Sequence, residues 1–128
     1  MKVAVIGVGT MGRHHARVYS ELPEADLVSI SDSDSIRAHS TAEKFGIRAY
    51  TDHREMLEKE KPDAVSVVVP TALHEKVGMD ALDAGVNVLI EKPIAATVEE
   101  GTRINEKARA MNKQLMVGHV VRFDPALQ

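Results

Sequence analysis

The alternation of short apolar runs with longer segments of helical spacing is the feature that most constrains how this chain folds. The apolar runs span residues 3–6, 27–30, 64–69, 86–90 and 115–117, and a weaker candidate spans 48–50. Because the runs are apolar at nearly every position, we expect strands buried on both faces, as in a parallel sheet. Helices are predicted over the intervening segments 11–21, 34–45, 52–60, 71–84 and 97–111. Strand and helix repeated in this way predict a doubly wound α/β fold with right-handed crossovers.

Residues that start and stop helices agree with this pattern. Gly46 and Gly85 stand where helices should end in a left-handed turn. The pairs Thr97 with Glu100 and Asp52 with Glu55 have the spacing of capping boxes, in which side chains accept from the free amides of the first helical turn. We therefore expect helices to begin at both pairs.

Length and composition exclude several classes of protein. The 128 residues suffice for one compact domain, and the absence of cysteine excludes disulfides, thiolate metal sites and a cysteine nucleophile. A net charge of -3 and only four aromatic residues argue against a nucleic-acid partner. The apolar runs are far shorter than the roughly 20 residues that cross a bilayer, so no membrane partner is expected. A cytoplasmic location fits this composition.

A glycine-rich turn joins the first predicted strand to the first predicted helix. It reads Gly7-Val8-Gly9-Thr10-Met11-Gly12. Gly7 permits a tight turn, Gly9 lets a pyrophosphate approach the backbone, and Gly12 lets the helix pack on the strand. The helix start at Thr10 and Met11 offers free amides and a positive dipole end to phosphates. Such a turn also occurs as a plain strand-to-helix connection, so its context decides the interpretation.

Asp32 supplies that context, because it directly follows the second predicted strand. A carboxylate there can accept hydrogen bonds from the two ribose hydroxyls of an adenosine. It would repel a 2′-phosphate, which favours NAD over NADP. NADP remains possible, because Ser33 and Arg37 could accommodate a phosphate, although Arg37 also fits as a solvated helix residue. A mononucleotide or acyl-carrier ligand at the same turn would leave Asp32 unexplained.

Two later strand ends carry polar residues, and in open α/β sheets ligands bind beyond such ends. Pro70-Thr71 with His74 follows one strand, and Glu91-Lys92-Pro93 follows the next. Together with the glycine turn, the stretch 71–93 and the tail 117–125 resemble the glucose–fructose oxidoreductase/inositol dehydrogenase family (Gfo/Idh/MocA). The resemblance covers essentially the whole chain.

The resemblance implies an NAD(P)-dependent dehydrogenase acting on a sugar, sugar nucleotide, cyclitol or related polyol. It places Lys92 beside the nicotinamide and the substrate hydroxyl, where an ammonium can orient the alcohol and stabilise developing alkoxide charge. Thr71 is expected to cap its helix and to touch the cofactor, and Glu91 to fix the loop after its strand. The cofactor-binding residues so predicted are Gly7, Gly9, Thr10, Met11, Gly12, Asp32, Ser33, Arg37, Pro70, Thr71, His74, Glu91 and Lys92.

The six histidines divide unevenly, and none is expected to bind a metal. His15 fits a role in packing or local hydrogen bonding, and His39 and His53 fit the surface. His74 is as well placed to contact cofactor or substrate as to serve the fold. The role of His119 is open, because the family more often carries another residue there.

The family places a second, sheet-rich domain after the dinucleotide fold. We therefore expect residues 1–118 to form the NAD(P)-binding domain and 119–128 to begin the connection to an absent substrate domain. This chain alone is then expected to be inactive, and its exposed docking face to favour self-association. The alternative function is a non-catalytic NAD(H)-binding module that senses the cofactor or regulates a partner.

Overall fold

The computed structural model describes residues 1–91 and 95–118, and these form six strands, five α-helices and one short 3₁₀ turn. No helix in these two segments is long and apolar enough to cross a membrane. The strands are β1 (Lys2–Ile6), β2 (Asp26–Ser31), β3 (Arg48–Tyr50), β4 (Ala64–Val67), β5 (Asn87–Ile90) and β6 (Leu115–Val117). The helices are α1 (Thr10–Glu21), α2 (Ser35–Phe45), α3 (His53–Glu60), α4 (His74–Asp83) and α5 (Val98–Ala110), with the 3₁₀ turn η1 (Thr71–Leu73) before α4.

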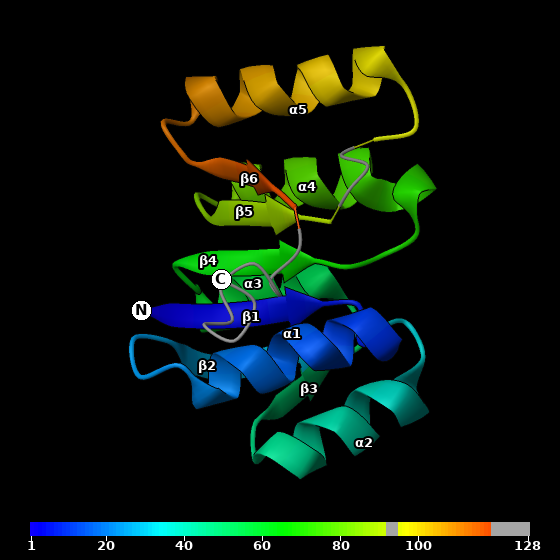
Figure 1. Cartoon of the computed structure of the whole chain (residues 1–128), viewed down its shortest axis with the longest axis vertical. Helices are drawn as coiled ribbons and strands as arrows, with labels where there is room; N and C mark the ends of the chain where they lie inside the picture. The colour runs from blue at the N-terminus through cyan, green and yellow to red at the C-terminus, as the bar shows by residue number, and fades with distance from the viewer. Residues whose placement is uncertain (92–94, 119–128) are drawn as a thin grey trace.

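The strands form one parallel sheet in the order β3-β2-β1-β4-β5-β6. The first two crossovers run outward from β1 in one direction, and the later ones run in the other direction. As a result α1 and α2 cover one face of the sheet, while α3, α4 and α5 cover the other (Figure 1). The doubly wound parallel fold predicted from the sequence is confirmed.

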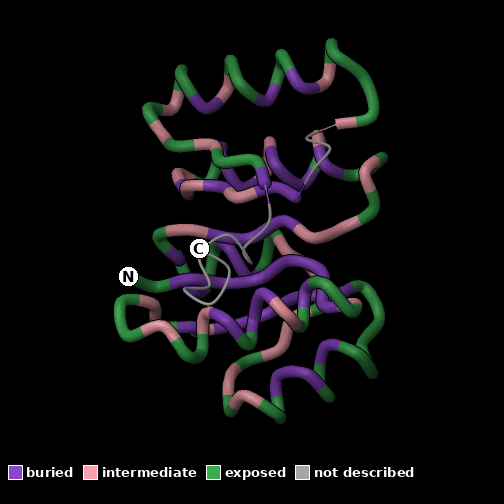
Figure 2. The backbone as a smooth tube through the Cα atoms, in the orientation of Figure 1, coloured by how far each residue is buried: buried purple, intermediate pink, exposed green. Residues whose placement is uncertain are grey.

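Two apolar clusters hold the helices to the sheet. Along β1, Val3 and Val5 pack with α1 and α2, whereas Ala4 and Ile6 pack with the helices of the opposite face. This division explains why the strand sequences are apolar without alternation, because side chains on both faces are buried. Figure 2 shows the inner strands as largely buried and the outward sides of the helices as exposed.

The helix boundaries follow local chemistry in most places. Gly46 and Gly85 take positive φ angles of 66° and 79°, and both helix ends are closed as predicted. Thr97 caps α5 by accepting a hydrogen bond from the Glu100 amide at 3.2 Å. The Glu100 carboxylate accepts a hydrogen bond from the Ala96 amide, whereas in a capping box it would accept from the amide of the cap residue, Thr97.

Three sequence-based expectations about the elements are wrong. The strand predicted over 64–69 ends at Val67, because its neighbours β1 and β5 end beside it at Ile6 and Ile90. The capping box at Asp52 does not form: Asp52 accepts from the Arg54 amide, while the Glu55 carboxylate accepts from Lys59 at 2.8 Å.

The third concerns Thr71. Thr71 is the first residue of the 3₁₀ turn rather than the cap of the following helix, and Pro70 occupies the cap position. Residues 71–84 therefore form a 3₁₀ turn and then α4, instead of one continuous helix.

On the sheet face where α1 and α2 pack, these helices cover one half and leave the other half more open. Among the described residues, α1 and α2 lie over β1, β2 and β3, while the side of α1 towards β6 borders an apolar groove of about 330 Å³. Among the residues that line the groove are Leu89, Met116, Tyr19 and Leu22, and Met116 is 46% exposed.

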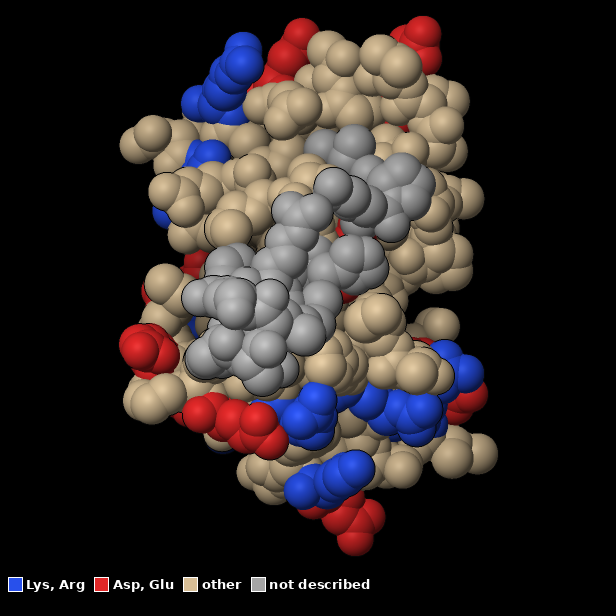
Figure 3. Space-filling view, viewed as in Figure 1, with Lys and Arg blue, Asp and Glu red and all other residues tan. Residues whose placement is uncertain are grey.

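The surface over α1 and α2 is charged. Figure 3 shows Lys and Arg side chains gathered over these two helices, with Asp and Glu side chains beside them.

Candidate dinucleotide site

The turn between β1 and α1 requires glycine at two positions. Gly7 has a φ of 92°, its amide donates to the Ser31 carbonyl at 2.8 Å, and a Cβ on it would lie 2.2 Å from the Val68 carbonyl oxygen. A Cβ on Gly12 would lie 1.8 Å from the Gly7 carbonyl oxygen. Tight turning and close helix–strand packing therefore account for both residues, as predicted.

Gly9 differs from these two glycines. A Cβ added to it would meet no protein atom within 4 Å, so the chain's own packing does not exclude a larger residue. Gly9 caps α1 through its backbone with no side-chain hydrogen bond, and the first turn at Thr10 and Met11 contains no acidic residue. This arrangement leaves open space in front of the positive end of a helix, as a bound phosphate group requires.

Asp32 is tied to the glycine turn by direct contacts. Its side chain is 7% exposed, Oδ2 accepts from the Val8 amide at 2.9 Å, and Oδ1 accepts from the Asp34 amide at 2.8 Å. The Arg37 guanidinium lies 3.5 Å from Oδ2. The carboxylate therefore fixes the turn and the end of β2 to each other, with a cation at its outer side.

A pocket of about 500 Å³ opens at the carboxyl ends of β1, β2 and β4. Its size lies within the range typical of ligand sites. Six of the predicted residues line it: Gly7, Gly9, Asp32, Ser33, Arg37 and Pro70. The sequence reasoning missed Thr51, His53, Val68, Val69, Leu73 and Lys76, which also line it. Thr51, Val68 and Val69 directly follow β3 and β4, so the strand-end rule could have identified them.

The other predicted residues that the structure describes are not among the residues that line this pocket. Thr10, Met11 and Gly12 form the first turn of α1, and Thr71 begins η1. His74 is buried, with its Nε2 2.9 Å from the Val69 carbonyl oxygen, so its ring supports the backbone that follows β4. Lys92, Pro93 and His119 lie outside the described residues. Contact of any of these residues with a cofactor stays a prediction.

Glu91, directly after β5, belongs to a buried network of polar side chains. Its Oε1 lies 2.5 Å from His15 Nε2, and His15 Nδ1 lies 2.9 Å from Ser66 Oγ. The Tyr19 hydroxyl lies 2.6 Å from the same Oγ. Burial raises the pKa of Tyr19, the hydrogen bond with Ser66 opposes this, and the nearby charge of Glu91 adds to the increase. His15 thus has the hydrogen-bonding role that was expected of it.

His53 does not lie on the surface as predicted. Its side chain is 19% exposed, and its Nε2 lies 2.8 Å from Asp80 Oδ2, which joins the start of α3 to α4. The prediction failed because a histidine at a helix start gives no local sign of a partner 27 residues away. His39 is exposed as expected, with its Nδ1 2.8 Å from the Ser35 carbonyl oxygen.

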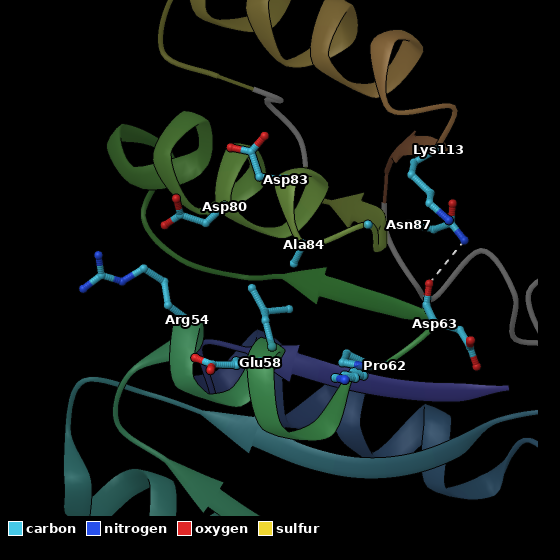
Figure 4. A pocket seen from close by; sticks show the side chains of 12 residues that line it. Arg54, Glu58, Pro62, Asp63, Asp80, Asp83, Ala84, Asn87 and Lys113 are labelled. Atoms are coloured by element: carbon cyan, nitrogen blue, oxygen red, sulfur yellow. Dashed lines mark hydrogen bonds between the residues drawn. The ribbon is translucent and has the colours of Figure 1, made fainter.

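A larger pocket, of about 640 Å³, lies between α3 and α4 near the amino ends of the strands (Figure 4). It adjoins Asp63 and Asn87 at the amino ends of β4 and β5. Two of its carboxylates already have partners, since Asp80 pairs with His53 and Lys76 and Asp83 pairs with Lys107. Ligands of doubly wound sheets bind at the carboxyl ends of strands, so the smaller pocket is the candidate site.

The sheet order, the glycine turn after β1 and the acidic residue after β2 define the dinucleotide-binding class of doubly wound α/β domains. A model of the oxidoreductase family with the NAD-binding Rossmann fold matches residues 1–119. The chain belongs to this family, Gfo/Idh/MocA, as its sequence resemblance indicated.

Similar proteins include dehydrogenases of sugars and inositols. UDP-N-acetylglucosamine 3-dehydrogenase of Acidithiobacillus ferrooxidans is 37% identical over all of this chain and 40% of its own length. The NAD(+)-dependent scyllo-inositol 2-dehydrogenase of Bacillus subtilis is 34% identical over 98% of this chain and 37% of its own. The structure of GenD2 from gentamicin A biosynthesis in complex with NAD superposes with a TM-score of 0.88 at 33% identity, covering 92% of this chain and 34% of that one. This chain thus spans about two fifths of the length of its curated relatives.

Proposed function

We propose that this chain is the cofactor-binding domain of an NAD(P)-dependent oxidoreductase that transfers a hydride between nicotinamide and a hydroxyl carbon of a sugar, sugar nucleotide or cyclitol. The observation that carries the proposal is the contact between the Asp32 carboxylate and the Val8 amide. It holds the acid that follows β2 against a turn with open space at Gly9, which supports ribose binding at Asp32 and phosphate binding at the turn. Membership of the family and the dehydrogenases among its relatives support the same function.

The described residues fit a dinucleotide in chemical terms. The amino end of α1 at Gly9, Thr10 and Met11 would hold the pyrophosphate, and Asp32 would accept from the adenosine ribose. We propose NAD as the preferred cofactor, because a 2′-phosphate would face the Asp32 carboxylate. Arg37 already lies beside that carboxylate, so binding of NADP would need its guanidinium to turn towards the phosphate.

The bound nicotinamide would supply the hydride acceptor, and the chain's own residues would position the substrate. By family resemblance we propose Lys92 as the group that orients the hydroxyl and stabilises its developing negative charge. A lone lysine is a poor acceptor for the hydroxyl proton without a partner base. We therefore expect the 128-residue chain to bind cofactor without efficient turnover.

Calorimetric titration of the 128-residue chain with NAD and with NADP tests the binding proposal. We expect saturable binding that prefers NAD and weakens tenfold or more in Asp32→Ala, since a hydrogen bond to a charged group contributes about 1.5–3 kcal/mol. Asp63→Ala is the matched control. Asp63 also accepts from a backbone amide, that of Lys2 at 2.8 Å, but it lies at the amino ends of the strands, away from the candidate site. Binding of neither nucleotide by the wild-type chain would overturn the proposal.

The catalytic function and the sensing alternative differ in their dependence on Lys92. A catalytic domain should gain dehydrogenase activity when it is mixed with, or fused to, the remaining part of a relative from this family. Lys92→Ala should abolish that gain, while NAD binding persists through the turn after β1 and Asp32. Full turnover by the Lys92→Ala protein would contradict the catalytic assignment.

We further propose that this chain acts in the cytoplasm and that copies of it self-associate through the apolar face beside α1. The chain contains no cysteine, which fits a reducing compartment. The groove between α1 and β6, with Leu89 and the exposed Met116, supports self-association.

A further inference from the structure

The buried network around Glu91 connects three elements that lie far apart in the sequence. His15 and Tyr19 come from α1, Ser66 from β4 and Glu91 from the end of β5. His15 and Ser66 are fully buried, and Glu91 is 7% exposed. The rings of His15 and Tyr19 also meet edge to face, with their centroids 6.4 Å apart.

The direction of these hydrogen bonds follows from the carboxylate and from the protonation state of the imidazole. A carboxylate only accepts, so His15 Nε2 donates to Glu91 Oε1 at 2.5 Å. In a neutral imidazole Nδ1 then accepts from the Ser66 hydroxyl, which leaves the Ser66 oxygen to accept from Tyr19. With the imidazole in that neutral state, each donor of the network points towards the Glu91 carboxylate and orients it.

The network is built on the helix that would hold the cofactor phosphates. His15 is the sixth residue of α1, less than one turn after Gly12, and its contact with Glu91 ties the end of β5 to this helix. In doubly wound folds a dinucleotide spans both halves of the sheet, one nucleotide on each. With the adenosine half at Asp32, the nicotinamide half falls at the ends of β4 and β5, where Glu91 precedes Lys92 in the chain.

We propose that His15, Ser66 and Tyr19 are positioning residues that hold Glu91, and with it the end of β5, in place for the nicotinamide half of the dinucleotide. This inference rests on the proposed function, because it presumes that the chain binds NAD. The network acts through Glu91, and none of its other three members needs to touch the cofactor.

The test compares NAD with ADP-ribose, which lacks only the nicotinamide, in calorimetric titrations of the 128-residue chain. His15→Leu removes both hydrogen bonds of the imidazole. We expect its NAD affinity to fall about tenfold, and its ADP-ribose affinity to change less than twofold. His15→Gln should recover part of the loss, because its amide can still donate to Glu91. If His15→Leu does not fold, the His15→Gln variant provides the test instead.

Two tyrosines provide a matched pair for the same titrations. Tyr19→Phe deletes the last hydroxyl of the network and should lower the ratio of NAD to ADP-ribose affinity about twofold. Tyr50→Phe deletes a hydroxyl that donates to another buried carboxylate, Glu60, at 2.5 Å, and should leave the ratio unchanged.

The outcomes separate this inference from the function on which it rests. If the wild-type chain binds neither NAD nor ADP-ribose, the proposed function fails. If it binds both equally, or if the folded His15 variants lose affinity for both ligands alike, the positioning role is wrong and the network serves only the fold.

Discussion

The two halves of the sheet meet the proposed cofactor in different ways. In the half formed by β1 and β2, the backbone itself makes the site, and the Asp32 carboxylate is bound to backbone amides. In the half formed by β4 and β5, the buried side chain of His15 from α1 contacts Glu91 and Ser66. The first arrangement joins the ends of two consecutive strands, with Val8 and Asp32 lying 24 residues apart, whereas the second depends on a contact between residues 15 and 91, which are 76 residues apart. A substitution at the turn should therefore act on folding, and one in the network should act on the position of a single strand end.

The largest effect is expected from Gly7→Ala. A Cβ there would meet the Val68 carbonyl oxygen at 2.2 Å, and the positive φ adds strain, so we expect a loss of about 4 kcal/mol in the free energy of unfolding. Gly46→Ala is the control, because its φ is also positive but no atom lies within 4 Å, and about 1 kcal/mol is expected. Urea denaturation measures both. Equal losses would show that the turn is not sterically fixed.

A smaller effect is expected from the two tyrosines at high pH. Burial is the first cause that raises the pKa of Tyr19, and the hydrogen bond to Glu60 is the first that raises the pKa of Tyr50. The folded chain therefore holds both phenolic protons more tightly than the unfolded chain, whose tyrosines titrate near 10.0. The resulting stability is full below that pH and is lost as the pH rises through the raised pKa values.

Urea denaturation at a series of alkaline pH values tests this prediction. In that range the free energy of unfolding should fall by at most about 1.4 kcal/mol per pH unit for each tyrosine. Tyr19→Phe and Tyr50→Phe should each make the fall less steep. An unchanged pH dependence in both variants would contradict the prediction that Tyr19 and Tyr50 have raised pKa values in the folded chain.

The smallest effect on stability is expected at the apolar groove. Met116→Lys should change the free energy of unfolding by less than about 0.5 kcal/mol, because the side chain is 46% exposed. It should nevertheless reduce self-association, since it places a charge on the face proposed to join two copies. Analytical ultracentrifugation over a range of concentrations measures this. Ile36→Lys is the control, because Ile36 is 82% exposed on α2, away from the groove. Equal self-association in the Met116→Lys and wild-type chains would leave the apolar face without a role.

Sequence alone determined the order and type of the elements, the glycine turn, Asp32 as the acid after β2, and the helix ends at Gly46 and Gly85. Each of these depends on a backbone requirement met within a few residues, such as a positive φ or a free helix amide. For the same reason the errors at the element ends were small, as at Val67, where the neighbouring strands decided the end.

Only the tertiary structure decided which strand ends meet in one pocket and which polar side chains find partners. Glu91 with His15, His53 with Asp80 and Glu60 with Tyr50 are each joined through the folded arrangement of strands and helices. A histidine or glutamate has the same local sequence signal whether it faces solvent or a buried partner. Strand order and register bring such residues together, and neither is encoded near any one of them.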